Sequence, residues 1–257
     1  PPKAPILCTK WKLTSKRHSI VQQAEFDLVA NDYAVQHQAS IKLSGEEPDF
    51  FARAKIEAAK AQCTAVGLAP KSMLDFGAGI GNAVAHLQEA FPRANLACLD
   101  VSEESLSVCR QRTIRPAEIL PYNGKEIPCK DDSFDFVFTA CVFHHIDEID
   151  HIALLREIRR VLSPNGRFML FEHNPWNPLT QHAVRNCPFD ENAVLISAPE
   201  MRRRLIKCGF GTVKTDYRTF FPAPLAALRP LERFLGWLPI GAQYSLFASG
   251  EASDHAR

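Results

Sequence analysis

SMLDFGAGIGN, at residues 72–82, is the most informative stretch of this chain. A short apolar run ends at an acid, passes through three glycines at alternate positions, and leads into the helical pattern AVAHL at residues 83–87. We interpret this pattern as a strand, a tight turn and a helix. Glycines permit backbone angles closed to other residues and let a ligand approach the main chain. The free N–H groups at a helix start favour an anionic ligand group, so the stretch predicts a ligand-binding turn.

The spacing of the glycines distinguishes the dinucleotide-binding fingerprint from other glycine-rich nucleotide-binding turns. In the dinucleotide fingerprint G-x-G-x-x-G, counting from Gly77 puts the third glycine at position 82, which is Asn82. The pattern here is instead Asp-x-Gly-x-Gly-x-Gly, from Asp75 to Gly81, which resembles the first motif of class I S-adenosylmethionine (SAM) dependent methyltransferases. A purely structural turn is the alternative, and an NAD-dependent oxidoreductase is disfavoured by Asn82.

Three later phrases resemble the small-molecule branch of the same family, the methyltransferases of types 11 and 12. They are SFDFV at 133–137, VFHHI at 142–146 and LSPNGR at 162–167. The resemblance extends from residue 72 to residue 209. It implies SAM as the methyl donor and S-adenosylhomocysteine as the product.

Apolar segments alternate with amphipathic ones along most of the chain. The pattern predicts strands at 72–76, 94–100, 117–122, 134–141, 167–172, 210–221 and 242–249. It predicts helices at 48–67, 82–91, 147–162 and 197–208, with a helixless loop at 172–179. Such alternation favours an α/β fold with a parallel sheet. The resemblance specifies this fold as the doubly wound, seven-stranded, Rossmann-like sheet of class I methyltransferases.

The chain is predicted to form one domain between two tails. A flexible basic tail is expected at 1–22, a single methyltransferase domain at 23–250 and a C-terminal tail at 251–257. Within the domain we expect an N-terminal helical cap at 23–68 and a lid-like insertion at 222–241, between the sixth and seventh strands. Leucines recur at helical spacing in the insertion. It is therefore either a lid packed on the domain or an interfacial helix at a membrane surface.

The resemblance assigns SAM binding to residues at the ends of the predicted strands. These are Asp75, Gly77, Ala78, Gly79, Gly81, Asp100, Val101, Asn123, Gly124, Thr139, Ala140 and Cys141. Asp100 follows Gly81 by 19 residues, where an acid accepts both ribose hydroxyls; capping the next helix is its alternative role. Asn123 departs from the family, which often has an Asp here to bind the adenine amino group.

Methyl transfer from SAM needs alignment of the reactants, and a base only when the acceptor has a proton to lose. His144 and His145, after the fourth strand, are candidate bases, with His145 preferred and Glu172 competing. Alternatively, one histidine orients the loop and the other packs. Candidate substrate-binding residues complete the predicted site: Tyr33, His37, His173, Asn174 and Trp176.

Composition narrows the class of protein. The 257 residues are 46% hydrophobic and 23% charged with a net charge of +1, which is ordinary for a globular enzyme and gives no sign of a nucleic-acid partner. The eight cysteines include no C-x-x-C pair, so we expect reduced, mostly buried thiols and no metal site. No signal peptide or long apolar run is visible, which predicts a cytoplasmic protein with optional peripheral membrane contact through 222–241.

The sequence therefore predicts a SAM-dependent methyltransferase that acts on a small molecule, at an oxygen atom. A natural product, a sugar and a lipid-like compound all remain open as acceptors. A catalytically silent SAM-binding domain is the main alternative.

Overall fold

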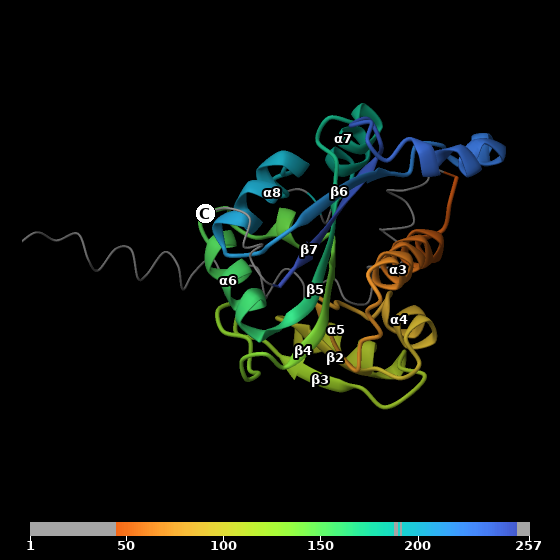
Figure 1. The fold of residues 1–257 in the computed structure, drawn as a ribbon. Coiled ribbons are helices and arrows are strands. Elements are labelled where there is room, and N and C mark those ends of the chain that lie inside the picture. Colours follow the sequence, from red (N-terminus) through yellow and green to blue (C-terminus); the bar gives the residue numbers. More distant parts are fainter. Residues whose placement is uncertain (1–44, 188–189, 191, 251–257) are drawn as a thin grey trace, which may run out of the picture.

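A seven-stranded sheet forms the centre of the computed structural model, which describes residues 45–187, 190 and 192–250 (Figure 1). The strands are β1 Ser72–Phe76, β2 Asn95–Asp100, β3 Glu118–Pro121, β4 Phe134–Ala140, β5 Leu162–His173, β6 Val213–Arg218 and β7 Gln243–Ser249. Their order across the sheet is β3-β2-β1-β4-β5-β7-β6. Neighbours are parallel from β3 to β5, whereas β7 is antiparallel to both β5 and β6. The predicted seven-stranded, Rossmann-like α/β fold is confirmed.

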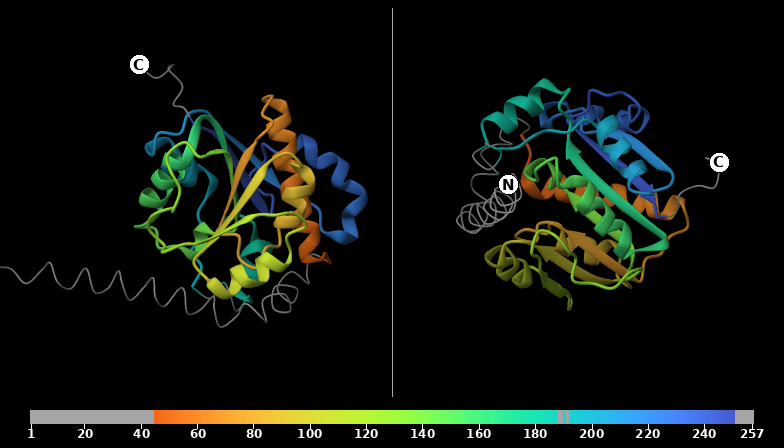
Figure 2. Two further views of the ribbon diagram at one scale, coloured as in Figure 1. Left: turned by 90° about the horizontal axis from the view of Figure 1, so that it is seen from below. Right: turned by 90° about the vertical axis from the view of Figure 1, so that its left-hand side faces the viewer.

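Helices cover both faces of this sheet (Figure 2). The α-helices are α3 Pro48–Ala65, α4 Val84–Ala90, α5 Glu103–Gln111, α6 His151–Val161, α7 Pro178–Arg185 and α8 Ala198–Lys207. Two 3₁₀ helices, η2 Phe143–His145 and η4 Ala223–Phe234, lie in connections. Buried side chains of α3, α4 and α5 form one core layer, and those of α6 and α8 form the other. Within these described residues, no helix has both the length and the apolar character that a membrane crossing requires.

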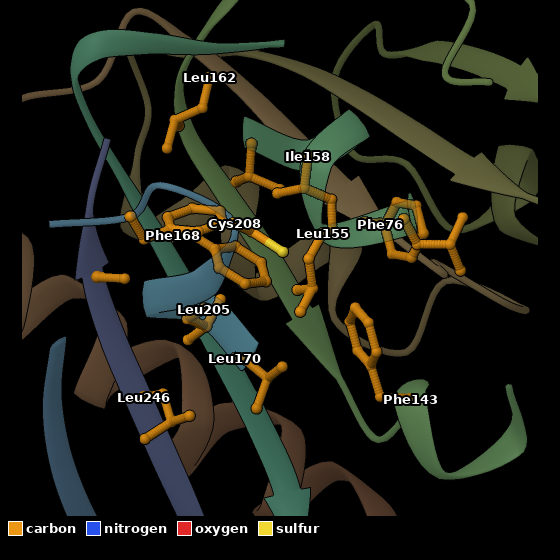
Figure 3. Close-up of a cluster of buried hydrophobic side chains, with 14 of the residues drawn as sticks. Phe76, Phe143, Leu155, Ile158, Leu162, Phe168, Leu170, Leu205, Cys208 and Leu246 are labelled. Atoms are coloured by element: carbon orange, nitrogen blue, oxygen red, sulfur yellow. The ribbon is translucent and has the colours of Figure 1, made fainter. Parts of the chain in front are cut away.

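The layer under α6 and α8 explains why the central strands lack polar alternation. Leu155 and Ile158 of α6 and Leu205 of α8 pack toward Phe168 and Leu170 of β5 (Figure 3). All five side chains are fully buried. Because the opposite face of the sheet is covered as well, successive residues of β5 are apolar on both sides.

Several predicted boundaries are wrong by a few residues. The predicted strand 210–221 shortens to β6, which ends before Thr219, a residue with a φ of +62°. The predicted strand 167–172 lengthens, because β5 begins at Leu162. The helix expected from residue 147 begins at His151, since a turn with a 2.9 Å Asp150 N–H to Asp147 C=O hydrogen bond precedes it.

A further difference concerns the loop at 172–179, which was expected to contain no helix. Helix α7 begins inside it, at Pro178. The Asn177 side chain caps this helix by accepting the Thr180 N–H at 2.9 Å. Proline at the first helical position, preceded by an Asn cap, is a helix-start signal that outweighs the two Asn-Pro steps.

The insertion at 222–241 lies where predicted, between β6 and β7, and carries η4. Leu228, Leu231 and Phe234 are three residues apart, which matches the three residues per turn of a 3₁₀ helix, and all three are exposed. The predicted tails at 1–22 and 251–257, and the part of the cap with Tyr33 and His37, lie outside the described residues. The described cysteines form no disulfide and most are buried, as predicted.

Candidate functional site

The carboxyl ends of β1 to β5 meet at one edge of the sheet, because these strands are parallel. This is the edge at which open α/β sheets bind ligands. Most of the predicted cofactor and catalytic residues are brought together here, from Asp75 in β1 to Glu172 in β5. The loop after β5 and the end of the insertion lie at the same edge.

The three glycines after β1 serve two different purposes. Gly77, Gly79 and Gly81 have φ angles of +75°, +52° and +82°, which favour glycine. A Cβ on Gly77 would lie 2.4 Å from Val142 Cγ2, and one on Gly81 would lie 3.0 Å from the Cys109 Cα. A Cβ on Gly79 would meet nothing within 4 Å. Gly77 and Gly81 thus permit close packing, while Gly79 leaves an open approach to the main chain.

Asp100 holds this loop in place. Its Oδ2 accepts the Gly79 N–H at 2.7 Å and its Oδ1 accepts the Ser102 N–H at 3.0 Å. Ser102, not Asp100, caps α5 by accepting the Ser105 N–H at 3.0 Å. A carboxylate oxygen can accept more than one hydrogen bond, which suits the predicted role of Asp100 toward the two ribose hydroxyls.

Buried polar atoms near this edge lack partners. Among the described side chains, Asp75 Oδ2, Thr139 Oγ1 and Tyr122 OH are buried without a hydrogen bond. Burial, reinforced by the charge of Asp100, raises the pKa of Asp75 to about 7. SAM carries an ammonium and a sulfonium charge, so a buried acid with an unused oxygen beside an open glycine suits such a ligand. The residues present therefore fit the cofactor that the sequence predicts.

Asn123 has a structural role that the sequence did not reveal. Its Oδ1 accepts the N–H groups of Lys125 at 2.9 Å and Glu126 at 3.0 Å, which closes a turn that includes Gly124 at a φ of +76°. The carbonyl that was expected to accept the adenine amino group is therefore engaged by the backbone. The other predicted cofactor residues, Ala78, Val101 and Ala140, are partly exposed at this edge.

Four ionisable side chains form a compact cluster beyond β4 and β5. His144 Nδ1 lies 2.6 Å from Glu172 Oε2, and Glu172 Oε1 accepts the N–H groups of Val142 and Phe143 at 3.0 and 2.7 Å. Asp190 Oδ1 lies 3.4 Å from His144 Nε2 and 3.5 Å from His145 Nε2. Sequence reasoning missed Asp190, since no motif marks a residue 45 positions after His145.

The charges in this cluster distinguish the two candidate bases. Burial alone would lower the pKa of His144, but the Glu172 and Asp190 carboxylates raise it to about 10. Against the effect of burial, the charge of His144 lowers the pKa of Glu172. Burial and the neighbouring His144 charge lower the pKa of His145 to about 3. At neutral pH His144 is therefore an imidazolium, and the His145 ring is neutral.

Cys141 has an unusual environment at the end of β4. Its φ is +59°, and Lys55 Nζ of α3 donates to its Sγ at 3.4 Å, with Gln243 Nε2 at 3.9 Å. Burial would raise the pKa of Cys141, but the Lys55 ammonium and His173 lower it to about 6. Cys141 is thus a thiolate at neutral pH, and Lys55 and Gln243 are site residues that the sequence pattern did not indicate.

Two candidate substrate residues after β5 have different roles: Asn174 is a buried structural residue, and Trp176 carries an exposed ring. Asn174 is buried, and its Nδ2 donates to the carbonyls of Pro239 at 3.1 Å and Gly241 at 2.8 Å. Its Oδ1 accepts the Trp176 N–H at 3.1 Å. Asn174 therefore fastens the insertion to this loop, while the Trp176 side chain is exposed beside it. The ring of His173 lies beside that of His144, tilted by 57°, with ring centroids 5.1 Å apart.

Comparisons with known proteins agree with this geometry. Residues 74–170 match a family model described as a methyltransferase domain. The malonyl-[acyl-carrier protein] O-methyltransferase of Geobacter sulfurreducens is 27% identical over 182 residues, which cover 66% of this chain and 67% of that one. The fatty-acid O-methyltransferase of Mycolicibacterium smegmatis is 24% identical over 160 residues, 62% of this chain and 58% of that enzyme. The matches thus span about two thirds of these relatives' lengths or less.

A solved structure shows the same fold. A SAM-dependent methyltransferase from Thermotoga maritima superposes with a TM-score of 0.63 at 18% identity, covering 90% of this chain and all of that one. The strand order, the glycine loop and the family match lead to one assignment. Residues 74–170 match the type 11 methyltransferase domain, and the fold around them is that of the class I SAM-dependent methyltransferases.

Proposed function

We propose that this chain transfers the methyl group of SAM to an oxygen atom of an apolar, lipid-like small molecule. The main support for this proposal is the position of one cluster at the edge of the sheet that also holds the glycine loop. The cluster consists of His144, His145, Glu172 and Asp190. SAM, when bound, supplies an activated methyl group. The glycine loop, Asp75 and Asp100 would hold SAM. The cluster would orient the acceptor and accept its proton.

A weakly basic imidazole suffices for this role when the acceptor is a hydroxyl. As the new O–C bond forms, the hydroxyl oxygen gains positive charge and its proton becomes strongly acidic. The neutral ring of His145 then accepts that proton, despite a pKa lowered to about 3. His144 stays protonated between Glu172 and Asp190, so we assign it and Glu172 to orientation of the cluster.

The apolar character of the acceptor is inferred from the insertion. Phe234 is 62% exposed and Trp237 is 74% exposed, and Leu225, Leu228, Leu231 and Ile240 are exposed with them. The insertion projects from the sheet edge beside α3 (Figure 1). Of the relatives above, one is named a fatty-acid O-methyltransferase, which supports an apolar acceptor, and one a malonyl-[acyl-carrier protein] O-methyltransferase, which supports oxygen as the acceptor atom. These observations support a lipid-like acceptor, delivered at or from a lipid surface.

Contacts on its other side hold the insertion in this orientation. Glu232 Oε1 accepts the N–H groups of Phe220 and Phe221 at 3.0 and 2.9 Å. Arg229 pairs with Glu46, and its guanidinium lies 4.5 Å from the ring centroid of Phe50 in α3. Glu232 and Arg229 thus fasten the insertion to the domain, whereas the apolar side chains point outward with Arg233, whose guanidinium lies 4.6 Å from the ring centroid of Phe234. An exposed apolar surface of this kind marks an interaction site.

The proposal is tested with SAM that carries a labelled methyl group. The protein is incubated with labelled SAM and a whole-cell extract, and products are partitioned between water and organic solvent. Label in the organic phase is expected. Label confined to water-soluble small molecules would overturn the lipid-like acceptor, and bound SAM without any transfer would support a silent SAM-binding domain.

The role of His145 is tested by His145→Ala, with His182→Ala as a matched control on exposed α7. Loss of a general base is expected to lower kcat about 10²- to 10⁴-fold while SAM affinity is unchanged. His182→Ala should leave both unchanged. An unaltered rate in His145→Ala would remove this residue from proton transfer.

Contact with lipid is tested by sedimentation with phosphatidylcholine–phosphatidylglycerol vesicles. Phe234→Ser and Trp237→Ser are expected to reduce the bound fraction. Ile114→Ser removes a side chain that is 55% exposed near the opposite edge of the sheet, between α5 and β3, and should bind as the wild type does. Equal binding of all variants would exclude the insertion as the lipid-contacting surface.

A further inference from the structure

The ionisable cluster has the composition of a metal site as well as of a proton acceptor. His144 and His145 come from η2, and Asp190 comes from the segment after α7. One ligand atom from each of the three residues lies within 4.8 Å of the other two. Two imidazole nitrogens and one carboxylate oxygen are a donor set that first-row transition metals prefer.

The distances in this cluster suit coordination better than direct hydrogen bonding. Asp190 Oδ1 is 3.4 Å from His144 Nε2 and 3.5 Å from His145 Nε2. A charge-assisted N–H to carboxylate hydrogen bond is about 2.7–2.9 Å long. Ligands at about 2.0–2.1 Å from a tetrahedral ion are about 3.4 Å from one another. The two distances from the Asp190 carboxylate to the histidine nitrogens therefore match those between ligands of one tetrahedral ion, and the two nitrogens lie within 4.8 Å of each other.

A second carboxylate already holds one ligand in the required orientation. His144 Nδ1 lies 2.6 Å from Glu172 Oε2, so its Nε2 is the nitrogen directed at Asp190. Glu172 is itself fixed by the N–H groups of Val142 and Phe143. A histidine whose other nitrogen binds a carboxylate is the usual arrangement around protein-bound zinc.

The backbone adds further support to the ligand positions. The Val194 N–H donates to the His144 carbonyl at 2.8 Å, which joins η2 to the segment that carries Asp190. His144 is fully buried, whereas the His145 and Asp190 side chains are 19% and 13% exposed. The cluster is therefore preorganised on one side and reachable by an ion from the other.

We propose that His144, His145 and Asp190 bind a divalent first-row transition metal such as Zn²⁺, with Glu172 orienting His144. Three protein ligands leave one coordination position open to water or to an acceptor oxygen. Binding of the ion would displace the Nε2 proton of His144 into solvent and would engage His145, so neither histidine would act as the base in a metal-loaded protein, and the ion would acidify an acceptor hydroxyl by coordination. This inference concerns ion binding and stands apart from methyl transfer, because it is tested without SAM or an acceptor.

The test titrates Co²⁺ into the chelator-treated, dialysed full chain and records visible d–d absorption. We expect one tetrahedral Co²⁺ per chain, displaced by Zn²⁺ but not by Mg²⁺, which prefers oxygen ligands. Loss of this spectrum is expected in His145→Ala and Asp190→Asn, with folding checked by circular dichroism. Glu172→Gln should weaken binding about 10- to 100-fold. His182→Ala and His86→Ala are the matched controls and should bind Co²⁺ normally.

Three results would overturn the proposal. The first is that the folded wild-type chain develops no tetrahedral Co²⁺ spectrum, and the second is that the Asp190→Asn variant keeps this spectrum. The third is a thiolate-to-cobalt charge-transfer band that disappears in Cys141→Ser, because it would place the ion at Cys141 instead. Failure of methyl transfer would change neither reading.

Discussion

Raising the pH from 5 to 8 is expected to lower the free energy of unfolding through the buried carboxyl group of Asp75. Asp75 is 2% exposed, and burial together with the Asp100 charge raises its pKa from 3.8 to about 7. A pKa that is higher in the folded state means that folding favours the protonated carboxyl. The stability from this group is fully present below pH 3.8, the unfolded pKa, and is lost as the pH rises through about 7. The shift corresponds to about 4 kcal/mol in total, of which about 3 kcal/mol falls between pH 5 and pH 8.

The assay is urea unfolding of the wild type and of Asp75→Asn at both pH values. All other titrating groups are present in both proteins, so the difference between the two pH dependences isolates Asp75. Any constant effect of the new amide cancels in that difference. The wild type is expected to lose about 3 kcal/mol more than Asp75→Asn. Equal losses in the two proteins would refute the reasoning that Asp75 is protonated in the folded state.

Two further predictions concern the glycine loop and the thiolate. Gly77→Ala is expected to cost about 2–5 kcal/mol, from its positive φ and the overlap with Val142, whereas Gly79→Ala should cost only about 1–2 kcal/mol but weaken SAM binding. Urea unfolding and calorimetry measure both effects, and equal destabilisation by the two changes would contradict the packing argument. Iodoacetamide should alkylate Cys141 with a midpoint near pH 6, and Lys55→Met should move that midpoint up by about one pH unit. Peptide mapping by mass spectrometry follows this reaction, and an unmoved midpoint would exclude Lys55 as the stabilising charge.

The fold was largely predictable because apolar runs and turn residues, which are local features of the sequence, determine most of its strands and helices. The strand at 72–76 was predicted with its observed bounds, since an apolar run between a polar start and a glycine turn fixes both ends. The early start of β5 was missed because the Pro-Asn-Gly phrase at 164–166 is typical of a turn, yet Leu162 before it already pairs with Phe134, and the phrase lies in an irregularity of the ladder before Arg167 pairs with Phe136. The prediction of secondary structure thus failed mainly where pairing between strands outweighed the local preference of the residues for a turn.

The candidate site was predictable only in part, for a related reason. His144, His145 and Glu172 were identified because they follow strands that the sequence marks clearly. Asp190 and Lys55 reach the same edge from separate elements, and nothing in their neighbours along the chain indicates the contact. Contacts between distant segments depend on packing, so a single sequence carries no local signal for them.

The direction of β7 places the insertion in a connection whose length can vary. Because β7 is antiparallel to its neighbours, the chain reverses between Arg218 and Gln243, beside the end of β5 at His173. A reversal of this kind tolerates insertion, since doubling the length of a loop costs only about 0.6 kcal/mol in closure entropy. The glycine loop has no such freedom, because Gly77 and Gly81 are packed against Val142 and Cys109. The connection between β6 and β7 is therefore the place where the insertion, and with it the preferred acceptor, can change while the glycine loop at the other half of the sheet stays the same.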